Sequence, residues 1–96
     1  MEAFLYRGIA HYESGNTDKA MENFEKILQY FKVSADAKYY MAKIFLERKQ
    51  HKKAKKFLEE AKVDFKKGFY NNRPYVEALR EIYWEDLEGL GTSIGN

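Results

Sequence analysis

The sequence predicts an all-α protein, a solenoid of five helices in one domain that spans residues 1–96. One pattern of three residues occurs twice. It consists of a small residue, a second small residue twelve positions later, and a large apolar residue four positions after that. These are Gly8, Ala20 and Phe24, and then Ala42, Ala54 and Leu58, 34 positions further on. A period of this length is typical of helical solenoids. Hairpin dipeptides such as Asn-Gly are absent, and no stretch alternates in the two-residue period of a strand.

Composition fits one small domain without covalent cross-links. The 96 residues are 45% hydrophobic and 17% aromatic, which is enough apolar material for a core. Charged residues reach 33% with a net charge of +2, so no strong overall field attracts nucleic acid. The absence of cysteine excludes disulfides and thiolate chemistry. No apolar run reaches the roughly 18–20 residues of a membrane span, and the N-terminus lacks a secretory pattern. We expect a cytoplasmic protein without membrane insertion; the periplasm or another compartment stays open if the chain is part of a longer one.

The first predicted pair of helices occupies repeat one, about residues 1–34. Residues 2–14 carry Leu5, Ile9 and Tyr12 in helical spacing. Gly15 is suited to end this helix, and Asn16 or Thr17 can cap the next. A second helix over 18–32 then carries apolar residues at the helical period.

The second predicted pair occupies repeat two, about residues 35–68. Ser34 can cap a helix over about 35–48, and a fourth helix over 51–67 ends at Gly68. A closing helix follows at about 73–88, with Pro74 in its first turn, where proline is tolerated. Three glycines in the last eight residues predict a frayed tail over 89–96.

The repeated residues resemble the tetratricopeptide repeat family over about residues 2–88. That family has a large residue, Leu-Gly and Tyr on a first helix, then Ala and Phe on a second. The first copy here is Phe4, Arg7-Gly8, His11, Ala20 and Phe24, and the second is Lys38, Met41-Ala42, Phe45, Ala54 and Leu58. Arg7, His11 and Lys38 depart from the pattern. A third partial copy is in register at Tyr75-Val76 and Leu79. The resemblance implies right-handed winding, with the first helices on the inner face.

The inner face is where the resemblance places a partner-binding groove. The predicted groove residues are Leu5, Ile9, Tyr12, Glu13, Tyr39, Lys43, Glu47, Arg73, Glu77 and Arg80. Apolar and acidic side chains among them predict a protein–protein interaction module or scaffold that binds a short partner segment, apolar with basic flanks. In the alternative to a binding groove, the acidic residues are ordinary surface residues and the tyrosines are buried in the core. One branch of the family clamps C-terminal carboxylates. The matching positions here, Leu5, Ile9, Tyr40, Tyr70 and Pro74, lack the polar side chains that this requires.

The predicted closing helix has more apolar surface than one neighbour can cover. Its stripe runs through Val76, Leu79, Tyr83, Leu87 and Leu90. Trp84 is therefore a candidate anchor for a homodimer or for the partner. Self-association through this helix is the second functional hypothesis. In the alternative, Trp84 folds back onto its own domain or meets a further part of a longer chain.

Residues 48–56 form the strongest charged feature, RKQHKKAKK. Such a run can bind nucleic acid or another anionic surface, which is the third hypothesis. However, Ala54, Leu58 and Ala61 cross it at helical spacing, and no aromatic residues alternate with the lysines. The pattern favours the solvated face of a packed helix.

Catalytic patterns are absent from the sequence. The two histidines, His11 and His51, have no ligand set at metal spacing. The neighbouring carboxylates Glu59-Glu60 and Glu85-Asp86 diverge by about 100° on a helix. Phosphate loops and nucleophile elbows are also missing. We therefore predict a protein that is not an enzyme, with no cofactor or metal.

Overall fold

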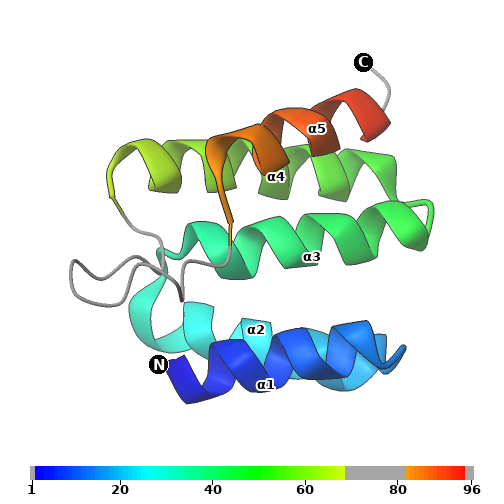
Figure 1. Cartoon of the computed structure of the whole chain (residues 1–96), viewed down its shortest axis with the longest axis vertical. Helices are drawn as coiled ribbons and strands as arrows, with labels where there is room; N and C mark the ends of the chain where they lie inside the picture. Colours follow the sequence, from blue (N-terminus) through cyan, green and yellow to red (C-terminus); the bar gives the residue numbers. More distant parts are fainter. Residues whose placement is uncertain (1, 69–81, 95–96) are drawn as a thin grey trace.

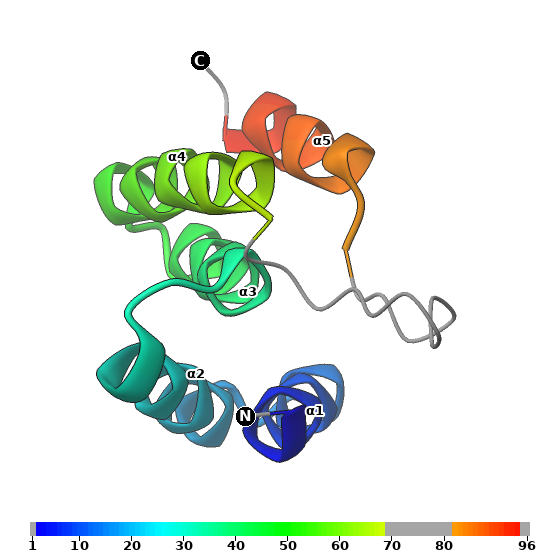
Figure 2. The same cartoon turned by 90° about the vertical axis from the view of Figure 1, so that its left-hand side faces the viewer.

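The computed structural model describes residues 2–68 and 82–94, and within them every regular element is an α-helix. The five helices are α1 (Glu2–Glu13), α2 (Thr17–Phe31), α3 (Ala35–Glu47), α4 (His51–Lys66) and α5 (Trp84–Ile94) (Figure 1). The helices pack as antiparallel pairs, α1 with α2 and α3 with α4 (Figure 2). The predicted all-α fold with five helices is confirmed.

Local signals in the sequence set the end of α1 and the starts of α2 and α3. Gly15 takes a φ of +88°, a conformation that favours glycine. The Asn16 side chain accepts a hydrogen bond from the Lys19 N–H at 3.3 Å, which caps α2. The Ser34 hydroxyl accepts one from the Ala37 N–H at 3.1 Å, which caps α3. The predicted caps therefore satisfy backbone donors that a helix start leaves unpaired.

The predicted small residues lie where two helices approach most closely. A Cβ atom built on Gly8 would lie 2.6 Å from the ring of Phe24, so only glycine fits there without a shift. Phe24 is fully buried, and its ring stacks on Tyr40 at a centroid distance of 5.6 Å. Phe24 thereby joins the α1–α2 pair to α3 of the next pair.

Lys38 replaces a large apolar residue of the family pattern, and the structure shows how the lysine is accommodated. It is buried, and its Nζ lies 2.7 Å from Asp64 and 3.5 Å from Glu60 on α4. Asp64 also accepts a hydrogen bond from the Ser34 N–H at 3.1 Å. The ion pair therefore links both helices of the second repeat to the start of α3.

The C-terminal helix lies further along the chain than predicted. Residues 82–83 are not helical, α5 begins at Trp84, and it continues to Ile94. The predicted end at residue 88 and the frayed tail over 89–94 are therefore wrong. Gly91 is buried, and a Cβ atom there would lie 3.5 Å from Leu58, an ordinary contact distance, so this part of α5 packs on α4. Residues 73–81 of the predicted helix lie outside the described residues.

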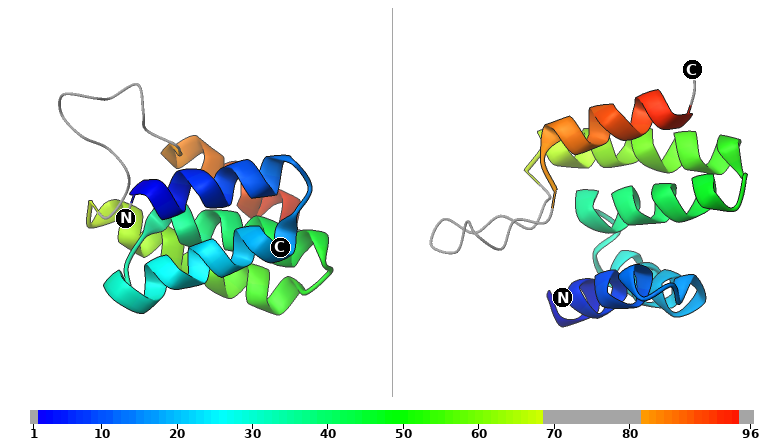
Figure 3. Two further views of the ribbon diagram at one scale, coloured as in Figure 1. Left: turned by 90° about the horizontal axis from the view of Figure 1, so that it is seen from below. Right: turned by 45° about the vertical axis from the view of Figure 1, so that its right-hand side comes forward.

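The position of α5 repeats that of α3. It packs on α4 of the preceding pair and touches α3, just as α3 packs on α2 of the preceding pair and touches α1 (Figure 3). Its buried residues Leu87, Leu90, Gly91 and Ile94 have the same spacing as Phe4, Arg7, Gly8 and His11. Among the described helices, α5 thus takes the place of a third first helix, 49 residues after α3 when Gly91 is compared with Ala42. The copy expected at Tyr75, Val76 and Leu79 lies outside the described residues.

Candidate functional site

Three of the predicted groove residues lie in the core. Leu5, Ile9 and Tyr39 are 3%, 8% and 9% exposed. Little of these side chains is left for a partner to contact, so their main role is to hold α1 and α3 in the fold. Arg73, Glu77 and Arg80 lie outside the described residues.

Tyr12, Lys43 and Glu47 meet on one surface, which we call the Tyr12 cluster. Tyr12 comes from α1, and the other two come from α3, one turn apart. The Tyr12 hydroxyl donates a hydrogen bond to the Glu47 carboxylate. The Lys43 ammonium lies 5.1 Å from the centre of the Tyr12 ring, within the range of a cation–π interaction. Tyr12 and Lys43 stay half-buried and Glu47 is exposed, so the cluster is accessible.

The Lys43 ammonium also lies over the rings of two further tyrosines of α3. The Lys43 ammonium lies 5.3 Å from the ring centre of Tyr39 and 5.4 Å from that of Tyr40. The Tyr12 and Tyr40 rings meet edge to face at 5.6 Å. A single ammonium therefore contacts three aromatic rings from two repeats, which holds the lysine over the junction of α1 and α3.

Burial and nearby negative charge raise the pKa of the Tyr12 and Tyr39 phenols. Burial raises the pKa of the Tyr12 phenol well above its ordinary value, and the hydrogen bond to Glu47 and its charge raise it further. Burial likewise raises the pKa of Tyr39, with a smaller effect from the Asp86 carboxylate. Near neutral pH the Tyr12 hydroxyl is therefore a hydrogen-bond donor and not a phenolate.

Two further acidic residues accompany Glu47, the acidic member of the cluster. Glu13 and Glu47 are exposed, and the charge of Asp86 on α5 reaches Tyr39. Asp86 was not among the predicted groove residues, because the predicted third repeat followed a strict 34-residue period. The spacing of Leu87, Leu90, Gly91 and Ile94 is the sequence signal that would have placed α5, and with it Asp86, beside α3.

Trp84 folds back onto its own domain. Its ring lies 5.8 Å from that of Phe65 on α4, and the ammonium groups of Lys62 and Lys66 lie 5.9 Å and 5.1 Å from its centre. The ring is half-buried in this contact. Its role as an anchor for a partner or a second copy stays a prediction.

The basic run forms the outward face of a packed helix. Ala54, Leu58 and Ala61 on α4 are buried, whereas Lys52, Lys53, Lys55 and Lys56 are exposed. Arg48 forms an ion pair with Asp18 on α2, since its guanidinium lies 2.7 Å from that carboxylate. This arrangement matches the predicted solvated face.

Replacing Lys52, Lys53, Lys55 and Lys56 with Gln should leave the melting temperature nearly unchanged, because exposed charges contribute little to stability. Thermal melts followed by circular dichroism measure this. A large drop in melting temperature would mean that the lysine stems pack against α3 and α4 more than their exposure indicates.

The described part of the chain offers no helix with the length and apolarity needed to cross a membrane. Within the same residues, no three His, Asp or Glu side chains gather in a way that would hold a metal ion.

Comparison with protein families matches residues 11–80 to the tetratricopeptide repeat. No curated protein and no solved structure gives a significant match. Domains of this family generally act as protein–protein interaction modules and are typically non-catalytic. The match covers more than half of the chain and includes α2, α3 and α4. The chain therefore belongs to the tetratricopeptide repeat family.

Proposed function

We propose that this domain binds a short segment of a partner protein across α1 and α3, with the Tyr12 cluster as the central contact. The observation that carries this proposal is that Tyr12 and Lys43 come from two repeats, contact each other, and remain half-exposed. A surface built by two repeats can bind a partner only when the fold is intact. An aromatic ring with a fixed polar group is a frequent anchor at protein interfaces.

The charges around the cluster suggest the chemistry of the partner. Glu13 and Glu47 are exposed carboxylates, and Asp86 adds a third negative charge near Tyr39. Lys43 is the cation within the cluster, and its ammonium already makes cation–π contacts with three aromatic rings. Complementary charges favour a segment with basic residues flanking an apolar one. The apolar residue would lie against the Tyr12 ring and the Lys43 stem.

Tyr12→Ala should weaken binding of this partner by about 1–3 kcal/mol, the usual range for an interface anchor. Tyr12→Phe keeps the ring but removes the hydroxyl that donates to Glu47, so a smaller loss is expected. Isothermal titration with the partner segment measures both affinities, and circular dichroism checks the fold. If Tyr12→Ala unfolds the domain or binds as tightly as the wild type, the Tyr12 cluster is not the contact surface.

The partner segment can be found by comparative capture. Immobilised wild type, Tyr12→Ala and the fourfold Lys→Gln variant of α4 are exposed to the same lysate, and captured proteins are mapped as overlapping synthetic peptides. The proposal expects a basic, partly apolar peptide that binds the wild type and the Lys→Gln variant but binds Tyr12→Ala weakly. Peptides that depend on the α4 lysines instead would favour an anionic partner on that face.

A further inference from the structure

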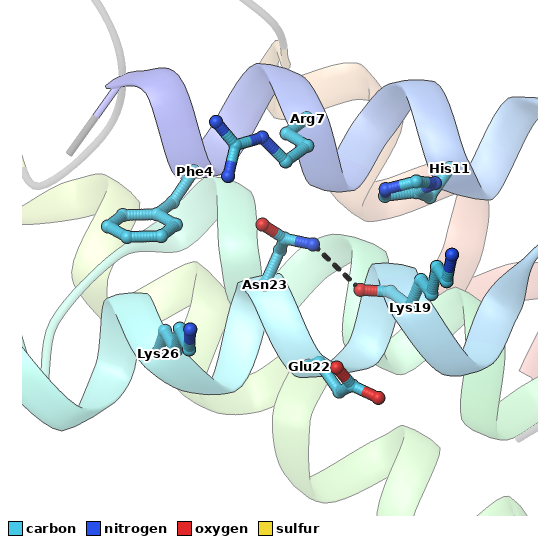
Figure 4. Close-up of a pocket in the computed structure, with 7 residues that line it drawn as sticks. All are labelled: Phe4, Arg7, His11, Lys19, Glu22, Asn23 and Lys26. Atoms are coloured by element: carbon cyan, nitrogen blue, oxygen red, sulfur yellow. Dashed lines mark hydrogen bonds between the residues drawn. The ribbon is translucent and has the colours of Figure 1, made fainter.

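A second surface lies between α1 and α2, on the side turned away from α3. The space there measures about 210 Å³ (Figure 4). Its lining residues are Phe4, Arg7, His11, Lys19, Glu22, Asn23 and Lys26. On α2, Lys19 and Lys26 lie on the side opposite Phe24, the residue that stacks on α3. We call this surface the α1–α2 seat, and it shares no residue with the Tyr12 cluster.

The seat has a surplus of positive charge. Arg7, Lys19 and Lys26 are exposed cations, and none forms an ion pair with another described residue. Glu22 is the one carboxylate of the lining, and it lies on the side of α2 farther from α1 (Figure 4). Arg7 and Lys26 lie 5.9 Å and 5.7 Å from the centre of the Phe4 ring. Two cations beside an aromatic ring make a surface suited to carboxylates next to apolar groups.

The internal repeat allows the α1 side of the seat to be compared with the corresponding place in the second repeat. Met41 is the counterpart of Arg7 in the second repeat, and it is only 3% exposed because α2 packs on α3. Arg7 is exposed, and no described helix covers it. On its α1 side, the seat is therefore the position at which α2 lies one repeat further on. Its α2 side has no such counterpart, because Lys53, 34 residues after Lys19, is exposed.

The opposite end of the molecule carries a helix with complementary charge. On α5, Leu87, Leu90, Gly91 and Ile94 face the domain. Glu85, Glu88, Gly89 and Thr92 are exposed, and their spacing of three and four places them on the other side of the helix. Among these four residues there are two carboxylates and no cation, and the other two side chains are small. Figure 1 shows α5 and the α1–α2 pair at opposite ends of the stack.

We infer that two copies of this chain associate head to tail, with α5 of one copy in the α1–α2 seat of the next. Glu85 and Glu88 would pair with Arg7, Lys19 and Lys26. The contact is heterologous, so each complex leaves one seat and one α5 open, and longer oligomers form as concentration rises. The contact does not depend on the proposed partner groove, since the two surfaces are separate.

The size of the contact predicts weak association. An α5 of 11 residues is about 16 Å long, so the buried area lies at the low end for protein interfaces. Pairing of exposed charges is also screened by salt. We expect monomers at low concentration, and growth at high concentration that salt reverses.

Sedimentation equilibrium tests the inference. At about 0.5 mM protein and about 20 mM salt, the weight-average mass of the wild type should exceed the monomer by about 1.5-fold or more, and about 300 mM salt should return it to the monomer. The seat variant, Arg7→Glu with Lys26→Glu, should be monomeric, and so should the helix variant, Glu85→Lys with Glu88→Lys. Because their charges are complementary, an equimolar mixture of the two variants should associate again.

A matched control separates the seat from a general charge effect. Lys52→Glu with Lys53→Glu makes the same charge change on α4, and this variant should associate as the wild type does. Tyr12→Ala should also associate, whether or not it binds a partner. A wild type that is monomeric at low salt, a folded seat variant that still associates, or a mixture that stays monomeric would each overturn the inference.

Discussion

Asp64→Ala should lower the free energy of unfolding by about 3–5 kcal/mol, the usual effect of removing one partner of a buried ion pair. The Lys38 ammonium lies 2.7 Å from Asp64, and both side chains are less than 10% exposed. Without Asp64, the buried charge of Lys38 and the Ser34 N–H both lose their nearest partner. A small domain is stable by only about 5–15 kcal/mol, so much of the stability would be lost. Urea unfolding at neutral pH measures it.

Two variants control this experiment. Glu60→Gln should have a small effect, because Glu60 is more exposed and lies farther from Lys38, at 3.5 Å. Lys38→Met with Asp64→Leu replaces the whole pair by apolar groups and should recover much of the loss. An Asp64→Ala protein that loses less than about 1 kcal/mol would show that water reaches the Lys38 charge.

Phe24→Ala should destabilise the domain by about 3–5 kcal/mol, as expected for a large cavity in a core. Phe24 is fully buried, lies against Gly8 and stacks on Tyr40. Its loss therefore affects both the packing within the first repeat and the junction with the second. The same urea experiment measures the change. Phe31→Ala is a matched control on the same helix, because Phe31 is 49% exposed, and a much smaller loss is expected.

The close contact of Gly8 and Phe24 predicts a coupling between the two positions. Gly8→Ala places a Cβ atom 2.6 Å from the Phe24 ring, and such overpacking costs about 1–3 kcal/mol. In a Phe24→Leu background the ring is gone, so the same Gly8→Ala change should be tolerated better. A double-mutant cycle should show a coupling of about 0.5–3 kcal/mol. Additive effects would mean that α1 moves away from α2 without resistance.

The sequence placed the residues of the Tyr12 cluster on the correct face, but it did not show which other residues of that face are buried. Tyr12, Lys43 and Glu47 were each predicted on the inner face, and in the structure Tyr12 contacts both of the others. Leu5 and Ile9 were assigned to the same face, yet they are buried. Spacing on a helix gives the direction of a side chain, whereas burial depends on how closely the next helix approaches.

The sequence by itself determined the class of fold, the antiparallel pairing of the first four helices and the residues at their closest contacts. Gly8 and Ala20 carry this information because a helix pair can approach closely only where side chains are small, and Phe24 carries it because a large apolar ring fills the remaining space. Only the tertiary structure decided two other features. Lys38 is tolerated in the core because Asp64 and Glu60 lie near its ammonium, and these partners are 26 and 22 residues away in the chain. The place of α5 depends on its packing against α4 and α3, contacts between distant residues that outweigh the local tendency of glycine to end a helix.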